Sequence, residues 1–342
     1  MDLQSYGISM VLRNQNSLNI YEEDLEKATY VDDIFSFPSE DYRVERKLGE
    51  GSYGKIYEVM SVKTGDLYAV KLQKYDSLSA FREIVLEAIV NIILMKISEE
   101  KTNGPYVQRI YEIAYDPLRR QIYMRIEILD GTLGDLLLKY TPEKNDTLIP
   151  NILMQVSNIT EFFQEAVGMN HRDLKSDNIM YSMKEGKLHI KLIDLGLTCM
   201  TYKDIHFSSS TIFPNTHTCN RKSRDMSFLI LELLLDFADR MNPALYETLG
   251  EIVKFKVHGT ECRLDRYCPH EGFRQWLNSY EFLNRDDVEN PHTAPKELKK
   301  RMTAFIEKLK KRKSKTKSKR NVTVGRPKTK KLANVFRGFL YS

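Results

Sequence analysis

The sequence predicts an α+β protein of two lobes, with a β-rich lobe first in the chain and a larger helical lobe after it. Strand-like segments separated by turn residues follow one another over 41–129, and segments of helical length dominate from residue 130 onward. The chain has 342 residues, 42% of them hydrophobic and 29% charged, which is enough to build a core in each lobe.

The β-rich lobe is predicted over 41–129, after a mixed polar segment, 1–40, that we expect to form an N-terminal extension or an irregular cap. Alternating apolar residues predict three strands from Asp41 onward, joined by a glycine-rich turn and then by the turn "KTGD". The segment "SAFREIVLEAIVNIILMKI" has helical length, and two more strands joined at "DPLRR" complete the lobe.

The helical lobe is predicted over 130–295. The segments "GDLLLKY" and "PNILMQVSNITEFFQEAV" indicate helices, and two short strands flank the turn "KEG". Helical patterns then dominate from Ser227 to about Leu283. The apolar run from Phe228 contains Glu232 and ends at Asp236, so it indicates a buried helix rather than a membrane span.

The last segment, 296–342, is a basic tail rich in Lys, Ser and Thr that we expect to be disordered at least to Lys331. From Lys296 to Arg337 it has 18 basic residues against two acidic ones, a net charge of +16, so the remainder of a chain of net charge +5 carries −11. We expect electrostatic contact with nucleic acid or acidic partners; a solubilising arm is the equal alternative.

The sequence favours an intracellular protein, cytoplasmic or nuclear, with no membrane span. The N-terminus lacks the pattern of a signal peptide, Asp2 excludes myristoylation, and four cysteines suggest a reducing compartment rather than a disulfide scaffold. One cluster of soft ligands offers a zinc site as the weaker alternative to core packing, because its spacing matches no common zinc pattern. It consists of His258, Cys262, Cys268 and His270.

The glycine-rich turn "LGEGSYGKIY" predicts a phosphate-binding loop between two strands. Gly49, Gly51 and Gly54 let the backbone approach a polyphosphate with its N–H groups toward the oxygens. A Rossmann turn requires a helix directly after the glycines, whereas "KIYEVM" has a strand pattern. A bulged hairpin without a ligand is the alternative.

Lys71 lies in the apolar strand "YAVKLQ", 17 residues after Gly54. A lysine in a buried strand needs a partner, and the next helix offers Glu83 and Glu87, which are four residues apart. Either glutamate would hold Lys71 against phosphate oxygens. The alternative is an edge-strand lysine whose ammonium group reaches solvent.

The motif "HRDLKSDN", 171–178, brings a carboxylate, an ammonium group and a carboxamide together within six residues. Asp173 is placed to accept or orient a hydroxyl proton, and Lys175 to neutralise a transferring phosphoryl group. Asn178 and Asp194, in "LIDLG", offer the oxygen ligands that Mg²⁺ prefers. These residues predict phosphoryl transfer by positioning and charge stabilisation; a solvated polar loop is the alternative.

Taken together, the motifs resemble those of the eukaryotic-type protein kinase superfamily, of the serine/threonine type. The match comprises the glycine-rich turn, Lys71 in "AVK", "HRDLKSDN", and "DLG" in place of the usual DFG, over about residues 41–285. The resemblance implies a β-rich N-lobe on a helical C-lobe, with ATP between them and Mg²⁺ as the metal. The lysine-rich style and the degenerate activation segment are reminiscent of divergent kinases of large DNA viruses.

The resemblance also implies a role for each site residue. Asp173 and Lys175 are expected to be catalytic, with Lys71 as the phosphate anchor and Glu87, preferred to Glu83 on the pattern "LEAIV", as its partner. The residues expected to bind the metal are Asn178 and Asp194. The residues expected to bind ATP are Leu48, Gly49, Glu50, Gly51, Ser52, Tyr53, Gly54, Lys55, Ile56, Ala69, Lys71, Glu127 and Leu129.

Three further positions complete the resemblance. "EILDG", 127–131, resembles the hinge whose backbone holds adenine, and Ile126 is at the gatekeeper position. Asp225, in "SRDMSFL", resembles the buried aspartate that braces the catalytic loop.

The segment between Asp194 and Asp225 departs from the family pattern, because no Ala-Pro-Glu motif follows it. This departure leaves substrate choice open but does not touch the ATP-binding residues. Arg172 is placed to receive a phosphate on this segment. The candidate acceptors are Thr201, Tyr202, Ser208, Ser209, Ser210 and Thr211.

The sequence therefore predicts a serine/threonine protein kinase that transfers the γ-phosphate of ATP to protein hydroxyl groups. A pseudokinase acting as an ATP-binding scaffold is the first alternative, and the complete set of catalytic residues argues against it. A small-molecule or lipid phosphotransferase is the second. Members of that class usually lack the combination of a glycine-rich loop and "HRDLK".

Overall fold

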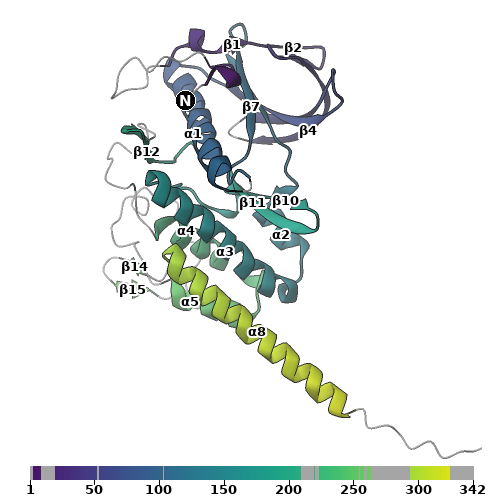
Figure 1. Ribbon diagram of the computed structural model, residues 1–342, viewed down its shortest axis with the longest axis vertical. Coiled ribbons are helices and arrows are strands. Elements are labelled where there is room, and N and C mark those ends of the chain that lie inside the picture. Colours follow the sequence, from purple (N-terminus) through teal and green to yellow (C-terminus); the bar gives the residue numbers. More distant parts are fainter. Residues whose placement is uncertain are drawn as a thin grey trace, which may run out of the picture.

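The structure, a computed structural model, has the predicted two-lobed α+β architecture (Figure 1). A curved sheet and one long helix form the first lobe, and most of the other helices form the second. The fold class is therefore confirmed. The residues that the structure describes are 3–8, 20–51, 54–102, 104–208, 219, 223–253, 255–257, 260–262 and 293–323.

The N-lobe is built on an eight-stranded sheet in the order β1-β7-β8-β6-β5-β4-β3-β2. Only the β1–β7 pair is parallel. Lys71 lies in the middle of the sheet, opposite Ile56 on one side and Met124 on the other. The strands are β1 (Glu26–Lys27), β2 (Thr29–Val31), β3 (Ile34–Ser36), β4 (Asp41–Gly51), β5 (Gly54–Ser61), β6 (Leu67–Lys74), β7 (Ile110–Asp116) and β8 (Gln121–Ile126).

The N-terminal segment is part of this sheet, which corrects the predicted lobe boundary at residue 41. β2 and β3 form a hairpin whose two turn residues, Asp32 and Asp33, both have positive φ angles, 50° and 61°. Aspartate tolerates this conformation, which matches the twist of a two-residue hairpin. Tyr30 stacks on Phe35 with ring centroids 4.2 Å apart, so the hairpin adds to the apolar layer of the sheet.

Helix α1 (Leu78–Lys101) packs between the sheet and the C-lobe (Figure 1). It begins at Ser77, whose Oγ accepts a hydrogen bond of 3.2 Å from the Ala80 N–H. Apolar residues lie on several of its faces and are buried, from Phe81 to Met95. The helix is therefore a core element that holds Glu87 in one position.

The C-lobe is mainly helical, with a small three-stranded sheet near the lobe junction. The predicted strand pair around "KEG" is confirmed as an antiparallel hairpin, and Glu185 and Gly186 in its turn both have positive φ angles. The elements are β9 (Gly131–Thr132), α2 (Leu133–Lys139), α3 (Pro142–Val167), β10 (Ile179–Lys184), β11 (Lys187–Leu192), α4 (Arg224–Asp236) and α5 (Pro243–Ile252).

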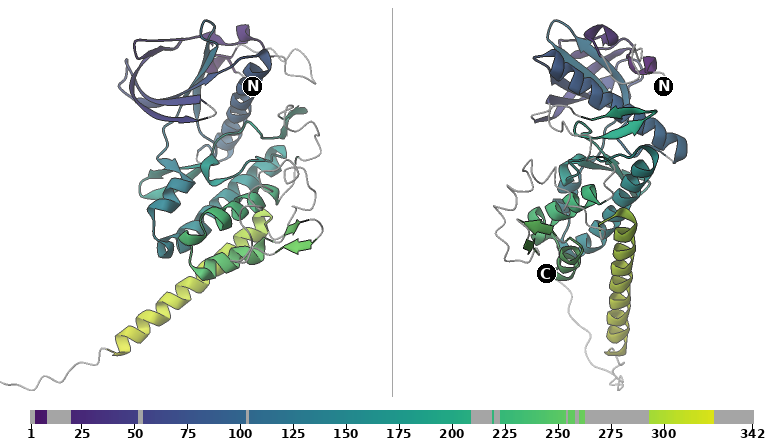
Figure 2. Two further views of the ribbon diagram at one scale, coloured as in Figure 1. Left: turned by 180° about the vertical axis from the view of Figure 1, so that it is seen from behind. Right: turned by 90° about the vertical axis from the view of Figure 1, so that its left-hand side faces the viewer.

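The basic tail begins as a helix, α8 (Pro295–Thr323), whose far end projects from the C-lobe (Figure 2). Leu298 and Met302 are fully buried, and Phe305 is 7% exposed, as the helix packs along α3. Their spacing forms a short apolar stripe that the lysines obscure in the sequence. The prediction of disorder from residue 296 is therefore wrong for α8, and 324–342 lie outside the described residues.

The remaining elements are short. The segment after Asp194 forms a hairpin of β12 (Met200–Tyr202) and β13 (Ile205–Phe207), and a second hairpin joins β14 (Phe255–Val257) to β15 (Thr260–Cys262). The 3-10 helices are η1 (Gln4–Tyr6), η2 (Glu22–Asp24), η3 (Ser176–Asn178) and η5 (Ala238–Arg240). In the described part of the chain, no helix combines the length and the apolar character that a membrane span requires.

Candidate active site

The loop that contains the predicted catalytic residues is tied to helix α4 by one buried carboxylate. Asp225 is 3% exposed and lies in the first turn of α4. Its Oδ1 accepts the Arg172 N–H at 2.9 Å, and its Oδ2 accepts the His171 N–H at 2.9 Å and Asn170 Nδ2 at 3.1 Å. The helix N-terminus favours the negative charge. Asp225 therefore holds the start of the loop in place without any ligand.

Within this loop, the carboxylate, ammonium and carboxamide groups of the motif lie in direct contact. Lys175 Nζ lies 2.9 Å from Asp173 Oδ2, and Asn178 Nδ2 donates to the same oxygen at 2.9 Å. Asn178 Nδ2 also donates to the Asp173 carbonyl at 2.8 Å. Among the described residues no hydrogen bond reaches Asp173 Oδ1, which leaves that oxygen available to a substrate hydroxyl.

Lys71 on β6 pairs with Glu87 on α1, with Nζ 3.1 Å from Oε1. The two side chains are 17% and 15% exposed, so the pair is largely shielded from solvent. Asp194 lies close by in a left-handed conformation, with φ of 55°. Burial raises the pKa of Asp194, the neighbouring Glu87 carboxylate raises it further, and Lys71 opposes both effects. Two carboxylates beside one lysine favour binding of a further cation.

The three glycines of the turn differ in how closely other atoms surround them. A Cβ atom at Gly54 would lie 2.1 Å from the Leu72 carbonyl oxygen, and the φ angle there is 115°. Around Gly49 and Gly51, by contrast, no heavy atom of the described residues lies within 4 Å of the position of an added Cβ. Among these three glycines, Gly54 is therefore the one whose described surroundings require glycine. Space at the other two is left for an approaching ligand.

Two cavities meet at this site, and they share Glu87 and Asp194. The first has a volume of about 690 Å³, and the predicted residues that line it are Leu48, Gly49, Ile56, Ala69, Lys71, Glu87, Glu127, Leu129, Lys175, Asn178 and Asp194. The second has a volume of about 610 Å³, and the predicted residues that line it are Glu50, Gly51, Gly54, Lys55, Glu87, Asp173 and Asp194. Every predicted site residue that the structure describes therefore lines one cavity or both. Ser52 and Tyr53 lie outside the described residues.

The segment predicted as the hinge is braced by hydrogen bonds and an ion pair of Glu127. The Glu127 backbone donates to the Arg109 carbonyl at 3.0 Å and accepts from Gln108 Nε2 at 3.0 Å. The Glu127 carboxylate accepts the Arg109 N–H at 2.8 Å and forms an ion pair with Lys191 on β11. Ile126 and Leu129 line the first cavity on either side of it. The ion pair has no signal in the sequence, because it joins residues 64 positions apart.

A second, half-buried carboxylate, whose role the sequence did not predict, supports the far end of the catalytic loop. Glu232 on α4 accepts the Ser176 N–H at 2.8 Å and the Ser176 Oγ–H at 2.6 Å. Burial raises the pKa of Glu232 to about 7, and the bonds from Ser176 oppose that rise. The loop is therefore held by α4 at both of its ends.

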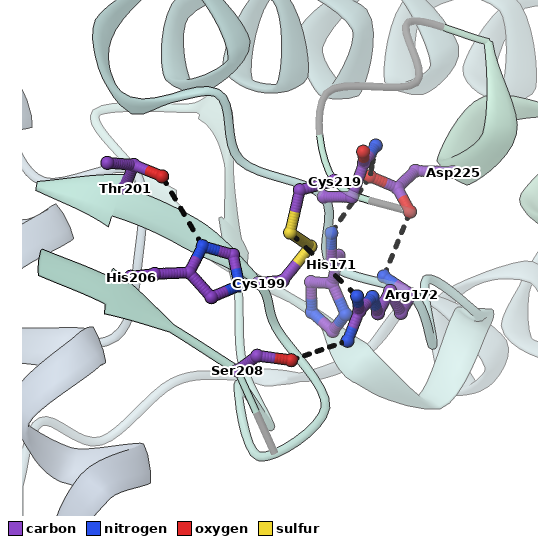
Figure 3. The surroundings of a disulfide bond; sticks show 9 residues. His171, Arg172, Cys199, Thr201, His206, Ser208, Cys219 and Asp225 are labelled. Atoms are coloured by element: carbon purple, nitrogen blue, oxygen red, sulfur yellow. Dashed lines mark hydrogen bonds between the residues drawn. A yellow bond between two sulfur atoms is a disulfide. The ribbon is translucent and has the colours of Figure 1, made fainter. Parts of the chain in front are cut away.

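Arg172 is buried beside the segment that follows Asp194, and its surroundings are shown in Figure 3. Its Nη1 donates to Ser208 Oγ at 3.0 Å, and its Nη2 lies 3.8 Å from Cys219 Sγ. Burial and the nearby Arg224 guanidinium lower the pKa of Arg172 to about 10, while Asp225 opposes the change. The Arg172 guanidinium thus contacts one of the predicted acceptor hydroxyls, Ser208.

A disulfide bond joins Cys199 to Cys219 across the same region (Figure 3). Cys199 pairs with Asn170 through two backbone hydrogen bonds of 2.9 Å, so one end of the bond is adjacent to the catalytic loop. The sequence favours reduced cysteines; the structure differs because the fold brings these two Cα atoms within 5.8 Å, a distance suited to a disulfide. Twenty residues of sequence separate them.

Two predicted features fall wholly or partly outside the described residues. Of the zinc candidates only Cys262 is described, at the end of β15; His258, Cys268 and His270 are outside. Of the acceptor candidates Thr201, Tyr202 and Ser208 are described, and 209–211 are outside.

Comparisons with known proteins point in one direction. A family model described as "Protein kinase domain" matches residues 42–217. The chain is 29% identical over 166 residues to the Ovarian-specific serine/threonine-protein kinase Lok of Drosophila melanogaster, covering 48% of this chain and 34% of that protein. It is 29% identical over 185 residues to Cyclin-dependent kinase C-3 of Oryza sativa subsp. japonica, covering 50% of this chain and 53% of that protein. The alignment thus spans 34% and 53% of the lengths of these two relatives.

Among solved structures, the twitchin kinase region from C. elegans aligns with 51% of this chain and 28% of its own, with a TM-score of 0.40 and 23% identity.

Proposed function

The chain belongs to the protein kinase family, and we propose that it is a serine/threonine protein kinase that transfers the γ-phosphate of ATP to protein hydroxyl groups with Mg²⁺. One observation supports this proposal most strongly. The predicted ATP-binding, metal-binding and catalytic residues that the structure describes all line two cavities that meet at Glu87 and Asp194.

In this proposal the first cavity holds the nucleotide. Its volume of about 690 Å³ suits a ligand of that size. Leu129, which follows the braced Glu127, presents its backbone groups to adenine, and Leu48 and Ala69 contribute apolar surface. Glu87 holds the Lys71 ammonium group at the inner end, where it neutralises phosphate charge. The open space around Gly51 admits the phosphates beneath the glycine turn.

Asn178 and Asp194 are the proposed Mg²⁺ ligands. The Asn178 amide nitrogen is engaged by Asp173, so its oxygen is the atom left to bind a cation. Asp194 is a half-buried carboxylate at the junction of the two cavities. Among the described residues no three acidic, histidine or cysteine side chains gather into a metal site, in keeping with an ion that takes its other ligands from phosphates and water. When bound, Mg²⁺ supplies charge that stabilises the phosphates.

Asp173 and Lys175 perform the remaining work in this proposal. Asp173 Oδ1 accepts and orients the hydroxyl proton of the substrate, while Oδ2 is held by Lys175 and Asn178. Lys175 also lines the nucleotide cavity, so its positive charge is available to the transferring phosphoryl group. The serine/threonine assignment rests on the "DLK" form of the motif and on the relative whose name states that specificity, the Ovarian-specific serine/threonine-protein kinase Lok.

The test is phosphate transfer from γ-labelled ATP, with Mg²⁺, to casein, to a basic protein and to the chain itself, followed by identification of the phosphorylated amino acid. We expect phosphoserine or phosphothreonine, and a loss of about 10²–10⁴-fold in rate for Asp173→Asn. Asp194→Asn should also lose transfer. Asp239→Asn is the matched control, because its side chain is 75% exposed and lies outside both cavities. ATP binding without transfer by the unaltered chain would favour the scaffold alternative instead.

A further inference from the structure

A third cavity, of about 640 Å³, lies between the end of α1, helix α3 and the β10–β11 hairpin. Its walls are joined by backbone hydrogen bonds: Leu192 N donates to Tyr106 O at 2.9 Å, and Gln108 N donates to Leu192 O at 3.2 Å. The cavity is therefore part of the folded protein and does not depend on a ligand to form. Its volume suits a small-molecule ligand.

The hairpin places a set of donor groups on one face of this cavity. Ser182 pairs with His189, and Met180 pairs with Lys191, in the antiparallel register. Residues that pair directly, and those two positions along each strand, point to the same side. Ser182 and Lys184 of β10 therefore share a face with His189 and Lys191 of β11, and all four line the cavity.

The electrostatic character of the cavity is strongly positive. Lys101 joins Lys184, Lys191 and His189 in the lining, and none of the described side chains that line it is acidic. Lys101 and Lys184 are exposed, and neither forms an ion pair with another described residue. Burial lowers the pKa of Lys191, and the nearby Lys184 charge lowers it further, against the effect of Glu127.

One buried hydroxyl in the cavity lacks a partner. Ser182 is 6% exposed, and its Oγ makes no hydrogen bond to any described residue. Buried polar atoms are nearly always hydrogen-bonded, so an unpaired one in a cavity wall indicates a group that arrives from outside. The hydroxyl would donate to the same ligand as the ammonium groups, which accept no hydrogen bonds.

We propose that this cavity is a binding site for a small phosphate-bearing anion, held by Lys101, Lys184 and the Ser182 hydroxyl. Ammonium groups bind phosphate as point charges, and a phosphate offers only acceptor oxygens at neutral pH to a wall of donors. The site is separate from the proposed nucleotide cavity, with which it shares no lining residue.

The ion pair between Lys191 and Glu127 connects the two sites. Lys191 lines the third cavity and Glu127 lines the first. An anion beside Lys191 competes with the Glu127 carboxylate for its ammonium group, and so loosens one of the contacts that brace the hinge. Coupling between two binding sites is reciprocal, so ATP must change the affinity for the anion by the same factor. This coupling, unlike the anion site itself, rests on the proposed function.

The binding test is calorimetric titration with inorganic tripolyphosphate at fixed ionic strength. Lys101→Ala/Lys184→Ala should weaken one class of site at least tenfold, whereas Lys71→Met, in the first cavity, should leave that class unchanged. Lys27→Ala/Lys63→Ala, at two exposed positions of the N-lobe, is the control for the loss of two positive charges. Unchanged binding in Lys101→Ala/Lys184→Ala would overturn the proposal, as would equal weakening by Lys27→Ala/Lys63→Ala or loss in Lys71→Met alone.

A hexaglutamate peptide in the same titration separates a phosphate site from an acidic-peptide site. If the peptide binds and tripolyphosphate does not, the ligand class that we propose is wrong. The coupling is tested by repeating the tripolyphosphate titration in saturating Mg·ATP. We expect a shift of about five-fold or more in affinity, the lower range for coupled sites. If the anion binds but its affinity does not change with Mg·ATP, the coupling is contradicted and the anion site is not.

Discussion

The catalytic loop and the glycine turn face the same two cavities but are built in opposite ways. The loop is held at both ends by carboxylates of α4, the buried Asp225 and the half-buried Glu232, through five hydrogen bonds of 2.6–3.1 Å. The glycine turn has exposed ion pairs, such as Lys55–Glu50 at 3.8 Å, and open space around two of its three glycines.

This difference shows which of the two segments the fold holds rigidly. Hydrogen bonds to buried charged groups are strong and costly to break, so the residues that act on the phosphoryl group are held in position before substrate arrives. Exposed ion pairs contribute little, so the glycine turn can adjust to the nucleotide beneath it. The predictions below test this contrast, beginning with the largest effect.

Asp225→Ala should have the largest effect on stability. It removes the acceptor for three groups of the catalytic loop and the carboxylate charge that acts on the buried Arg172. Breaking a buried charged network of this kind costs about 3–5 kcal/mol. Equilibrium unfolding in urea would measure the change. Asp239→Ala, at an exposed carboxylate, is the control, and similar losses for the two variants would contradict the anchoring role of Asp225.

Loss of the disulfide should come next. Cys219→Ser opens a covalent loop of 20 residues in sequence separation, and the chain-entropy model assigns such a loop about 3 kcal/mol. We expect a lower thermal midpoint in the variant and in the reduced wild type, with no further change when the variant is reduced. Cys199→Ser/Cys219→Ser controls for the unpaired Cys199 thiol that Cys219→Ser leaves behind. If Cys219→Ser is as stable as the oxidised wild type, the disulfide does not stabilise the fold.

Glu232 should make the unfolding free energy of the protein depend on pH. Its pKa rises from 4.5 in the unfolded chain to about 7 in the fold, so the native state binds more protons between these values. Stability therefore falls as the pH rises from about 4.5 to 7, by roughly 2–3 kcal/mol from this group. Glu232→Gln does not titrate; its amide oxygen can accept the Ser176 N–H, and its NH2 group can donate to the Ser176 hydroxyl oxygen. The unfolding free energy of the variant minus that of the wild type should therefore rise as the pH rises through this window. A constant difference would contradict the raised pKa.

The glycine turn should show the smallest effects, and they should differ between positions. Gly54→Ala places a Cβ against the Leu72 carbonyl and forces a positive φ, at a cost of about 1–3 kcal/mol. Gly51→Ala meets no atom within 4 Å and should change stability by less than about 1 kcal/mol. Its effect should appear instead as weaker nucleotide binding. Equal destabilisation by the two substitutions would show that the turn is packed throughout.

The sequence predicts the chemistry of the site better than its supports. Asp173 and Asn178 lie within one short motif whose spacing reflects local backbone geometry, and Asp194 is brought beside them by the predicted hairpin of β10 and β11. Glu232 and Lys191 act through partners 56 and 64 residues away, and nothing in the local pattern indicates those contacts. Long-range pairs between single charged residues depend on the tertiary fold.

The boundaries of the lobes were missed for a related reason. Residues 26–36 form very short strands whose pairing depends on a two-residue aspartate turn, too brief for a clear period. In α8, the lysines mask an apolar stripe of Leu298, Met302 and Phe305, which becomes meaningful only because α3 provides a surface for it. In both cases tertiary packing outweighs local composition.

The most direct test of the central claim measures Mg·ATP affinity and phosphate transfer on the same preparation of Asp173→Asn. The structure places Asp173 in the second cavity, outside the lining of the proposed nucleotide cavity. We therefore predict an ATP affinity close to that of the wild type together with a loss of transfer of about 10²–10⁴-fold. Transfer at the wild-type rate in Asp173→Asn would contradict the claim that this loop performs the chemistry.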